Sequence, residues 1–214
     1  MTATTPPDSG EEPPPLDGGR RSARDLIPSG LRPALRFVRW LPERSLHARR
    51  RSMAMRRLRA LMDVRSVLVL CEGNICRSPY AAALLENRTG GVPGGVRVTS
   101  AGFLRSDRPS PAEAIEAAAV RGVDLQRHRS RKVDAALMLD ADLILVMDPG
   151  HAHRVYGMAP SARARVLLLG ETDPRLFQRC VIPDPYGGDR ATFDECYDRI
   201  DRCVISLSRV LWPR

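Results

Sequence analysis

A thiol and a guanidinium are separated by five residues in the run Cys71-Glu-Gly-Asn-Ile-Cys-Arg-Ser78. A thiolate is a strong nucleophile, and the planar fork of an arginine can hold two oxygens of a phosphate at once. At the start of a helix, such a run also offers backbone N–H groups that ring an oxyanion and favour the thiolate form of Cys71. The run therefore predicts a loop in which Cys71 attacks a tetrahedral oxyanion held by Arg77. Ser78 can donate a hydrogen bond to the sulfur, which helps the sulfur to leave in a second step.

The surroundings of this run strengthen the prediction. Alone, a cysteine at a strand end is more often a small buried apolar residue, and an arginine at a helix start is more often solvated. Here the apolar run from Ser66 to Leu70 precedes the loop, and a segment with Pro79 in the first turn of a helix follows it. In an open α/β sheet, ligands bind at the carboxyl ends of the strands. Eight suitable residues between a strand and a helix therefore favour a functional site.

Cleavage of a phosphate ester also needs a proton for the leaving oxygen, and Asp184 is the candidate donor. It lies between Pro183 and Pro185, in a turn rigid enough to direct its carboxyl group, and Tyr186 and Gly187 follow. By itself an Asp-Pro pair indicates an ordinary turn. Together with the loop, it predicts a general acid. No group of histidines and cysteines has the spacing of metal ligands, and the chemistry predicts no metal and no other cofactor.

The elements that must position these residues alternate between short apolar runs and helical segments, which is typical of a parallel sheet. We expect four strands, at residues 66–71, 96–100, 142–147 and 165–169. We expect five helices, at residues 78–89, 111–121, 130–139, 150–157 and 192–211. The last helix carries apolar residues at spacings of three and four, which mark one buried face. The predicted fold class is α/β: a four-stranded parallel open sheet with helices on both faces, a Rossmann-like three-layer sandwich.

The net charge of +9 is concentrated in residues 20–65, which hold fourteen arginines and three acidic residues. Residues 1–30 are rich in proline, glycine and charge, and we expect a disordered tail there. Residues 31–64, the amino-terminal arm, suit two basic amphipathic helices around Pro42, ahead of a catalytic domain at residues 65–214. Three interpretations of the arm stay open: packing on the catalytic domain, binding to an anionic membrane surface, or binding to an acidic partner. Nucleic acid is disfavoured, because no recognisable nucleic-acid-binding fold accompanies the charge.

Cysteine usage and hydropathy predict a reducing, cytoplasmic setting. The cysteines are odd in number and lack the spacing of a small disulfide scaffold; they are Cys71, Cys76, Cys180, Cys196 and Cys203. The amino terminus lacks the basic start and apolar core of a signal peptide, and no stretch approaches the roughly 20 apolar residues of a membrane span. Attachment of the arm to lipid would place the protein at the inner face of the membrane.

The run from Cys71 to Pro79 resembles the signature of the low-molecular-weight protein tyrosine phosphatases, and four further segments follow in the order of that family. These are Ser100-Ala-Gly102, Gly122-Val-Asp-Leu-Gln-Arg-His128-Arg-Ser-Arg131, Met147-Asp148 and Asp184-Pro-Tyr-Gly187. The resemblance covers residues 65–212 and leaves the arm outside. It implies the α/β fold of that family and a bacterial hydrolase that dephosphorylates phosphotyrosine or other aryl phosphate monoesters without a cofactor.

The resemblance implies a catalytic role for three residues: Cys71 as nucleophile, Arg77 as phosphate ligand, and Asp184 as general acid and then general base. The implied reaction passes through a phosphocysteine intermediate. The implied substrate-binding residues are Glu72, Gly73, Asn74, Ile75, Cys76, Ser78 and Tyr186. Ser100 and His128 are expected to support a strained backbone at Asn74. Cys76 is expected to be a second thiol that can form a reversible disulfide with Cys71.

One segment departs from the family pattern. The residues from Phe103 to Arg108 are fewer and more basic than their counterparts in the family, and Phe103 is not expected to reach the cleft. Arg105 and Arg108 favour acidic sequence around the phosphorylated residue, or another phosphorylated ligand. Three histidines without an assigned role are expected at the surface: His47, His151 and His153.

Two alternatives to a phosphatase use the same loop. An arsenate reductase of this fold needs further cysteines near the third strand, but residues 142–150 contain none. A non-catalytic phosphate-binding adaptor has no need for Cys71, Arg77 and Asp184 together. The resemblance also implies candidate substrates, since bacterial members of the family act on tyrosine kinases that control exopolysaccharide export, or on host proteins.

Overall fold

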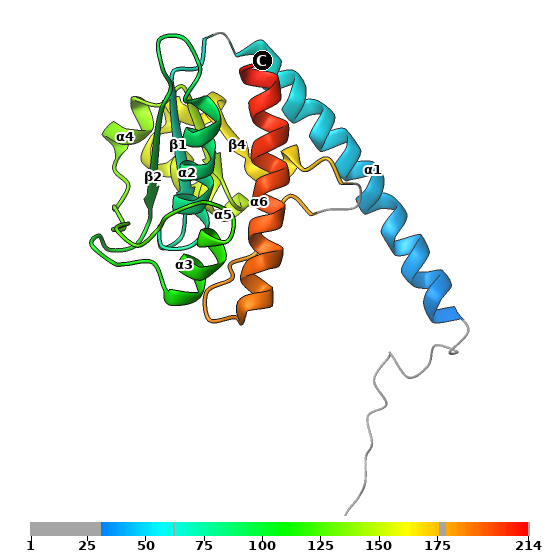
Figure 1. The fold of residues 1–214 in the computed structure, drawn as a ribbon. Coiled ribbons are helices and arrows are strands. Elements are labelled where there is room, and N and C mark those ends of the chain that lie inside the picture. The colour runs from blue at the N-terminus through cyan, green and yellow to red at the C-terminus, as the bar shows by residue number, and fades with distance from the viewer. Residues whose placement is uncertain (1–30, 62, 176–178, 214) are drawn as a thin grey trace, which may run out of the picture. The chain divides into compact units, whose positions relative to one another are not determined.

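A computed structural model describes residues 31–61, 63–175 and 179–213, with side chains from residue 46 onward. The chain forms two compact units, and the second, residues 40–214, contains the sheet and the predicted site (Figure 1). The tail predicted for residues 1–30 lies outside the described residues.

Four parallel strands form one sheet, in the order β2-β1-β3-β4. Their bounds are Ser66–Cys71 for β1, Arg97–Gly102 for β2, Leu143–Val146 for β3 and Val166–Leu168 for β4. The central strands β1 and β3 are rich in valine and leucine and are buried along their whole length, as expected for strands that helices cover on both faces. The predicted α/β fold with a four-stranded parallel sheet is confirmed, and strand ends differ from the prediction by at most two residues.

Helices occupy the connections between the strands and follow the last one (Figure 1). Their bounds are Arg77–Thr89 for α2, Ala112–Ala119 for α3, Ala135–Leu139 for α4, Pro149–Met158 for α5 and Arg190–Leu211 for α6. Two short 3-10 helices flank β4; they are η1 at Pro160–Arg165 and η2 at Leu169–Thr172.

The helix predicted at residues 130–139 is wrong in its first half, because α4 begins only at Ala135. Asp134 caps this helix, and its side chain accepts a hydrogen bond from the first turn. The residues before the cap lie along β2 instead, where Val133 N donates to Gly102 O at 2.8 Å. Pairing with a strand edge thus satisfies backbone groups that the prediction assigned to a helix.

Alternate residues of each strand point to opposite faces of the sheet, and each face has its own apolar core. In β1, Val67 and Val69 belong to the core that contains α2, α3 and α6. Leu68 and Leu70 belong to the core that contains α4 and α5. The face of α6 that its residue spacing predicted to be apolar is the buried one.

A single helix, α1 at Leu31–Ala60, replaces the two helices predicted around Pro42. A proline inside a helix removes one hydrogen bond and crowds the preceding turn, at a cost of about 3 kcal/mol. Here Pro42 removes the bond to the carbonyl of Val38, and the helix continues on both sides. One lost bond is a small part of a helix of 30 residues.

The second half of α1 packs into the core of the catalytic domain. Ala54, Met55 and Leu58 are each at most 5% exposed, and they belong to the same core as α2 and α6. Packing on the catalytic domain is therefore confirmed for this part of the arm. Leu46 and Met53 lie on the exposed side of the helix. None of the helices in the described part of the chain has the length and apolar character of a membrane span.

Candidate active site

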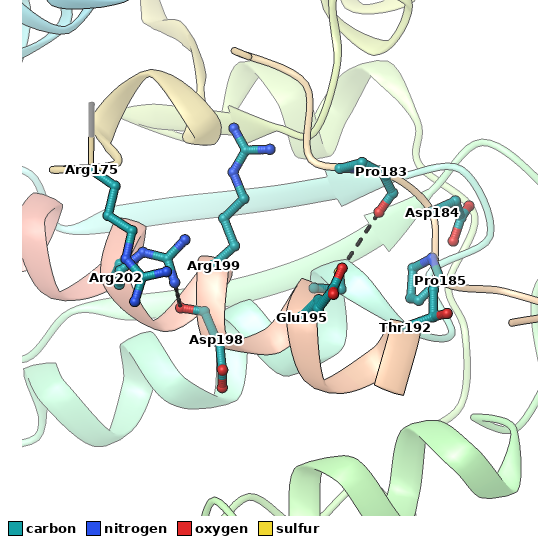
Figure 2. A pocket seen from close by; sticks show the side chains of 10 residues that line it. Arg175, Pro183, Asp184, Pro185, Thr192, Glu195, Asp198, Arg199 and Arg202 are labelled. Atoms are coloured by element: carbon teal, nitrogen blue, oxygen red, sulfur yellow. Dashed lines mark hydrogen bonds between the residues drawn. The ribbon is translucent and has the colours of Figure 1, made fainter. Parts of the chain in front are cut away.

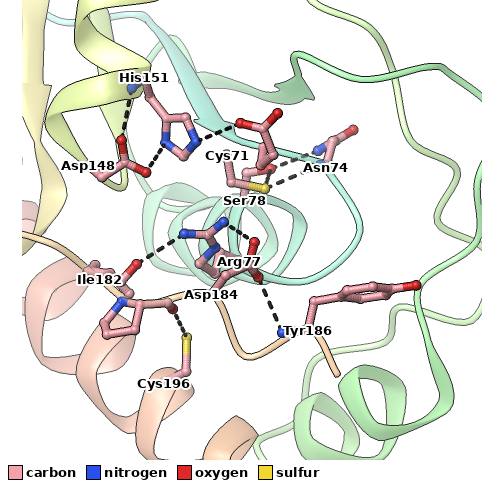
Figure 3. Close-up of polar contacts among 12 residues, drawn as sticks. Cys71, Asn74, Arg77, Ser78, Asp148, His151, Ile182, Asp184, Tyr186 and Cys196 are labelled. Carbon is pink, nitrogen blue, oxygen red and sulfur yellow. Dashed lines mark hydrogen bonds and ion pairs between the residues drawn. The ribbon is translucent and has the colours of Figure 1, made fainter. Parts of the chain in front are cut away.

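Cys71 ends β1 and Arg77 begins α2, so the loop between them lies at the carboxyl edge of the sheet. Figure 3 shows the polar contacts of this loop. The Cys71 sulfur lies 3.0 Å from Ser78 Oγ and accepts a hydrogen bond from Asn74 N at 3.3 Å. Ser78 Oγ itself accepts from Asn74 Nδ2 at 2.9 Å, and its one hydrogen can point at the sulfur or at Ala101 O, which lies farther away at 3.4 Å. Two donors therefore converge on a buried sulfur, an arrangement that suits a thiolate nucleophile.

Asn74 holds the shape of the loop from a fully buried position. Its φ of 51° lies in the left-handed region, which costs a residue other than glycine about 1–3 kcal/mol. Its side chain offsets this cost by donating to Ser100 Oγ at 2.9 Å and accepting from Arg131 N at 2.8 Å. Its carbonyl oxygen lies 2.7 Å from His128 Nε2. The structure thus brings Ser100 and His128 to Asn74, and it adds the backbone of Arg131, for which the sequence held no signal.

The ring of His128 acts as a hydrogen-bond donor to this carbonyl. Burial lowers the pKa of His128, and the bond to Asn74 opposes that effect only in part. The ring is therefore neutral at neutral pH, with the hydrogen on Nε2 directed at the Asn74 oxygen.

Gly102, at the end of β2, is required by the close approach of the loop. A Cβ atom at this position would lie 2.7 Å from Asn74 N and 2.8 Å from Glu72 O. Both are backbone atoms, so a side chain at Gly102 would distort the loop. The neighbouring Phe103 N donates to Glu72 O at 2.8 Å. The backbone of β2 therefore supports the loop directly.

Residues 179–186, the acid segment, bring Asp184 to the loop. Arg77 forms an ion pair with Asp184 and donates from Nη1 to Ile182 O at 3.1 Å. Ile182 N in turn donates to Met147 O at 2.9 Å, which ties the acid segment to the end of β3. The Arg77 side chain is 4% exposed and that of Asp184 is 41% exposed. The partly exposed carboxylate of Asp184, the candidate acid, thus contacts the buried guanidinium of Arg77, the candidate residue for binding phosphate.

Three further predicted site residues differ in their exposure. Ile75 and Cys76, both in the loop, are buried, whereas Tyr186 is 60% exposed. Tyr186 N donates to Asp184 Oδ1 at 3.3 Å, so the aromatic residue and the acid share one turn. Burial raises the pKa of the Cys76 thiol. All five cysteines of the chain are free thiols in this structure.

Residues 66–212 match the model of the low molecular weight phosphotyrosine protein phosphatases. The chain belongs to this family. It is similar to the low molecular weight protein-tyrosine-phosphatase Etp of Escherichia coli K12, at 38% identity over 144 residues that cover 67% of this chain and 92% of Etp. The chain is thus a protein phosphatase of this family, and hence a hydrolase.

Solved structures of similar phosphatases share the fold. Wzb of Vibrio vulnificus, solved in complex with benzylphosphonate, is 34% identical with a TM-score of 0.61, over 69% of this chain and 99% of Wzb. The YwlE arginine phosphatase of Geobacillus stearothermophilus is 29% identical with a TM-score of 0.60, over 68% of this chain and 91% of YwlE. Helix α1 lies outside the residues that match the family model.

Two of the three histidines expected at the surface of this phosphatase are buried, so that prediction is wrong for them. His47 is 2% exposed and His151 is 3% exposed, whereas His153 is exposed. His47 lies on the packed side of α1, where its Nε2 is 3.3 Å from Asp173 O. His151 lies in the first turn of α5, whose cap is Asp148. A capping residue three positions before a histidine is the sequence signal that could have placed His151.

His151 bridges α5 and the loop between Cys71 and Arg77, the candidate catalytic loop. Its Nδ1 lies 3.1 Å from Asp148 Oδ2, and its Nε2 lies 3.4 Å from Glu72 Oε2. The ring also stacks on Phe103, with 5.5 Å between ring centroids. Burial lowers the pKa of His151; Asp148 opposes this effect and the nearby Arg77 adds to it. The ring of His151 is therefore neutral at neutral pH, and it lies between Asp148 of α5 and Glu72 of the loop.

The outer surface of the loop is basic. Arg154 Nη1 contacts both carboxylate oxygens of Glu72, at 2.8 and 3.0 Å. The same guanidinium lies 4.0 Å from the centre of the Phe103 ring, which is buried beneath it. A Cβ atom on Gly73 would lie 3.5 Å from Arg108 Nη1, so a second arginine borders the loop. Phe103 is thus covered by arginine and histidine side chains, and Glu72 and Gly73 carry arginines on their outer side.

Proposed function

We propose that this phosphatase hydrolyses phosphotyrosine and other aryl phosphate monoesters through a phosphocysteine intermediate. The observation that carries the proposal is the meeting of Cys71, Arg77 and Asp184 at one edge of the sheet. Two hydrogen-bond donors converge on the buried sulfur, and the guanidinium at the start of α2 holds the carboxylate. A nucleophile, a phosphate ligand and a proton donor are the groups that cleavage of a phosphate ester requires.

In the first step, the substrate phosphate takes the place of the Asp184 carboxylate on Arg77, and the N–H groups of the loop ring its oxygens. The thiolate of Cys71 attacks the phosphorus in line with the leaving oxygen. The S–P bond forms as the bond from phosphorus to the aryl oxygen breaks. Once released from Arg77, the Asp184 carboxylate takes up a proton from solvent and transfers it to that oxygen. The products are phosphocysteine and a phenol.

In the second step, water attacks the phosphocysteine. Asp184, now a carboxylate, accepts a proton from the water as the new O–P bond forms and the S–P bond breaks. The Ser78 hydroxyl, 3.0 Å from the sulfur, stabilises the departing thiolate. Inorganic phosphate leaves, Cys71 is again a thiolate, and Asp184 carries the proton that the next cycle needs.

The charges around the loop favour an aryl ester over phosphoarginine, although the similar YwlE is an arginine phosphatase. A positively charged guanidinium leaving group would meet the arginines that border the loop, Arg154 and Arg108, and like charges repel. Glu72 is the carboxylate of the loop, and Arg154 occupies both of its oxygens. The apolar side chain of Ile75 and the exposed ring of Tyr186 suit a neutral aromatic group instead.

The basic surface around the loop supports a protein substrate whose phosphotyrosine has acidic neighbours. Arg154 and Arg108 border the loop, and Arg105 is exposed beside them in the sequence. Related proteins such as Etp are named protein-tyrosine phosphatases. We infer that the substrate of this chain is a phosphotyrosine protein, for which a bacterial tyrosine kinase is the leading candidate.

We further propose that the arm, residues 31–64, attaches the enzyme to the anionic inner face of a membrane, with an acidic protein as the alternative partner. The support is the excess of arginine in residues 20–65. Co-sedimentation with anionic vesicles tests this proposal on the full chain and on a chain without residues 1–39. Equal and negligible binding by both forms would remove the proposal.

Hydrolysis of p-nitrophenyl phosphate in the presence of a metal chelator tests the chemistry. We expect an active wild type and an inactive Cys71→Ser. Cys203→Ala, which removes a buried thiol on α6 away from the loop, is the matched control and should keep its activity. Rapid acid quenching of Asp184→Ala with substrate should trap one phosphoryl group on Cys71, detected by mass spectrometry. Full activity in Cys71→Ser would overturn the mechanism.

A further inference from the structure

The acid segment forms neither helix nor strand between η2 and α6, and side chains hold it in place together with the backbone bond from Ile182 N to Met147 O. We propose that Arg199 of α6 is a positioning residue for Asp184. Arg199 holds the backbone of the acid segment, and Asp173 holds Arg199. His47 of α1 contributes indirectly, through its contact with Asp173. This proposal rests on the proposed role of Asp184 as general acid.

Arg199 reaches from α6 to the backbone of the acid segment, beside the cavity that Asp184 also lines (Figure 2). Its Nη1 donates to Val181 O at 2.6 Å, and its Nη2 donates to Arg179 O. A planar guanidinium can hold two carbonyls at once, which the single ammonium of a lysine cannot reproduce. The next carbonyl along the chain, that of Ile182, accepts from Arg77. Two arginines from two helices thus hold the backbone that leads to the acid.

Asp173 keeps Arg199 in this orientation. Asp173 is fully buried, and its Oδ2 lies 3.4 Å from Arg199 Nε and 3.2 Å from Arg202 Nη2. A buried carboxylate between two arginines is strongly held, because loss of one partner leaves an uncompensated charge. The helix η2 before Asp173 lies directly against the acid segment: a Cβ atom on Gly170 would lie 2.2 Å from Cys180 O. The acid segment therefore packs closely on η2 and has no room to move toward it.

His47 connects this network to α1. Its Nε2 lies 3.3 Å from the carbonyl oxygen of Asp173, to which a ring nitrogen can only donate. Arg50, on the next turn of the helix, contacts Cys180 Sγ at 3.8 Å. Both residues lie outside residues 66–212, which match the family model. A helix beyond the family's domain therefore contributes to the placement of the general acid.

A positioning role can be told from a general structural role by the substrates that it affects. General acid catalysis matters most for a basic leaving phenolate and least for a phenolate that is already stable. A misplaced Asp184 therefore lowers kcat/KM for phenyl phosphate and spares 2,4-dinitrophenyl phosphate. Damage to the fold or to the catalytic loop lowers kcat/KM for both esters.

The experiment compares Arg199→Gln with Arg209→Gln. Arg209 is an exposed arginine of the same helix, and among the described residues it makes no hydrogen bond or ion pair. We expect Arg199→Gln to lose about tenfold or more of kcat/KM for phenyl phosphate, out of the roughly 100- to 10,000-fold that a general acid supplies, and less than about twofold for the dinitrophenyl ester. Inhibition by vanadate should be unchanged. Equal losses on the two esters, or no loss on either, would overturn the proposal.

Three further variants keep the test decisive if Arg199→Gln does not fold. Arg199→Lys keeps a charge beside Asp173 but loses the planar fork whose two nitrogens reach two separate carbonyls, and it should show the same selective loss. His47→Ala should show a smaller loss of the same kind, and His47→Gln, which keeps a donor, should recover it. Uniform losses, or none, in these variants count against the positioning role.

Asp184→Asn, measured in parallel, separates this proposal from the proposed function. An equal effect of Asp184→Asn on both esters would remove the general acid itself. A selective effect of Asp184→Asn without one in the Arg199 and His47 variants would remove only the positioning role.

Discussion

Arg77 and Asp184 form an ion pair across 107 positions of the sequence, and the same guanidinium holds the carbonyl of Ile182. One side chain therefore contacts both the candidate acid and the backbone two residues before it. In the proposed mechanism, a phosphate replaces Asp184 on Arg77, and the bond to Ile182 would still hold the acid segment in place. That mechanism couples binding of the phosphate and placement of the acid through one arginine.

Arg77→Lys should be severely impaired although it keeps the positive charge. A lysine cannot hold the phosphate and the Ile182 carbonyl together. We expect kcat/KM for p-nitrophenyl phosphate to fall by about 100-fold or more, as when a donor to the transition state is removed. Steady-state kinetics measure this, with Arg97→Lys as a control, since Arg97 makes an exposed ion pair with Asp140. Activity of Arg77→Lys close to that of the wild type would contradict the assigned contact.

Gly102→Ala should destabilise the domain and inactivate it. The added methyl group would overlap backbone atoms of Asn74 and Glu72, and overpacking of this kind costs about 1–3 kcal/mol. Gly157→Ala is the matched control, because no atom lies within 4 Å of a Cβ there and the residue is in a helix. That change should be neutral or slightly stabilising. Denaturant unfolding and phosphatase assays of both variants test the contrast; similar behaviour of the two would refute it.

Buried neutral His151 should make the stability of the domain fall in mild acid. Burial holds its pKa below the usual 6.5, so below that pH the unfolded chain binds a proton that the native state does not. The free energy of unfolding therefore decreases as pH falls from about 6.5 toward the native pKa, and is unaffected by this group above that range. Burial also lowers the pKa of His128, which adds to the same pH dependence. His151→Gln should flatten the dependence in part.

Guanidinium denaturation between about pH 7.5 and pH 5 measures this effect, in a range above the titration of ordinary carboxylates. His153→Gln is the control, since that histidine is exposed on the same helix. If the free energy of unfolding depends on pH as steeply in His151→Gln as in the wild type, His151 does not contribute.

Leu58→Ala should destabilise the phosphatase domain, although Leu58 lies outside the residues that match the family. The side chain is 1% exposed within the main core, and removal of a buried leucine costs about 2–5 kcal/mol. Met53→Ala, on the same helix with 48% exposure, should change stability by less than about 0.5 kcal/mol. Denaturant titration compares the two; an unaffected Leu58→Ala would mean that α1 is not part of the folded domain in solution.

Arg154→Gln should weaken the preference for acidic phosphopeptides. Arg154 lies beside the loop on Glu72 and Phe103, and an exposed charge of this kind acts most strongly at low salt. We expect kcat/KM for a phosphotyrosine peptide with glutamate neighbours to fall several-fold, and that for p-nitrophenyl phosphate to change little. Arg163→Gln, which removes a similar stacked arginine from Tyr156, is the control. An equal effect of the two variants on the acidic peptide would exclude Arg154 as a determinant.

Sequence could predict the catalytic loop because its eight residues are adjacent and lie between two elements with clear patterns. Cys71, Arg77 and Ser78 need no distant partner to be recognised. Asp184 is different, since a carboxylate between two prolines suits any turn, and only the loop and the pattern of the family singled it out. The sheet was predictable for the same local reason, because its central strands are short runs made almost wholly of apolar residues.

The contacts that sequence could not predict join segments far apart in the chain. Asp173 and Arg199 look like ordinary surface charges until folding buries the carboxylate against the arginine. His47 looks solvated for the same reason, since its partner Asp173 lies far along the chain. His151 is different, because the capping residue Asp148 three positions before it was a local signal. Pro42 misled in the opposite direction, because local preference predicted a break that the helix does not show.

Because one face of α1 is buried in the main core, the part of the chain that folds as a unit begins before Ser66, where the match to the family begins. A protein cut at that boundary would lack Met55 and Leu58, and the apolar surface that they cover would face water and promote self-association. It would also lack His47, whose partner Asp173 would keep its two arginines but lose its tie to the helix. A shortened enzyme intended for crystallisation or screening should therefore begin before His47.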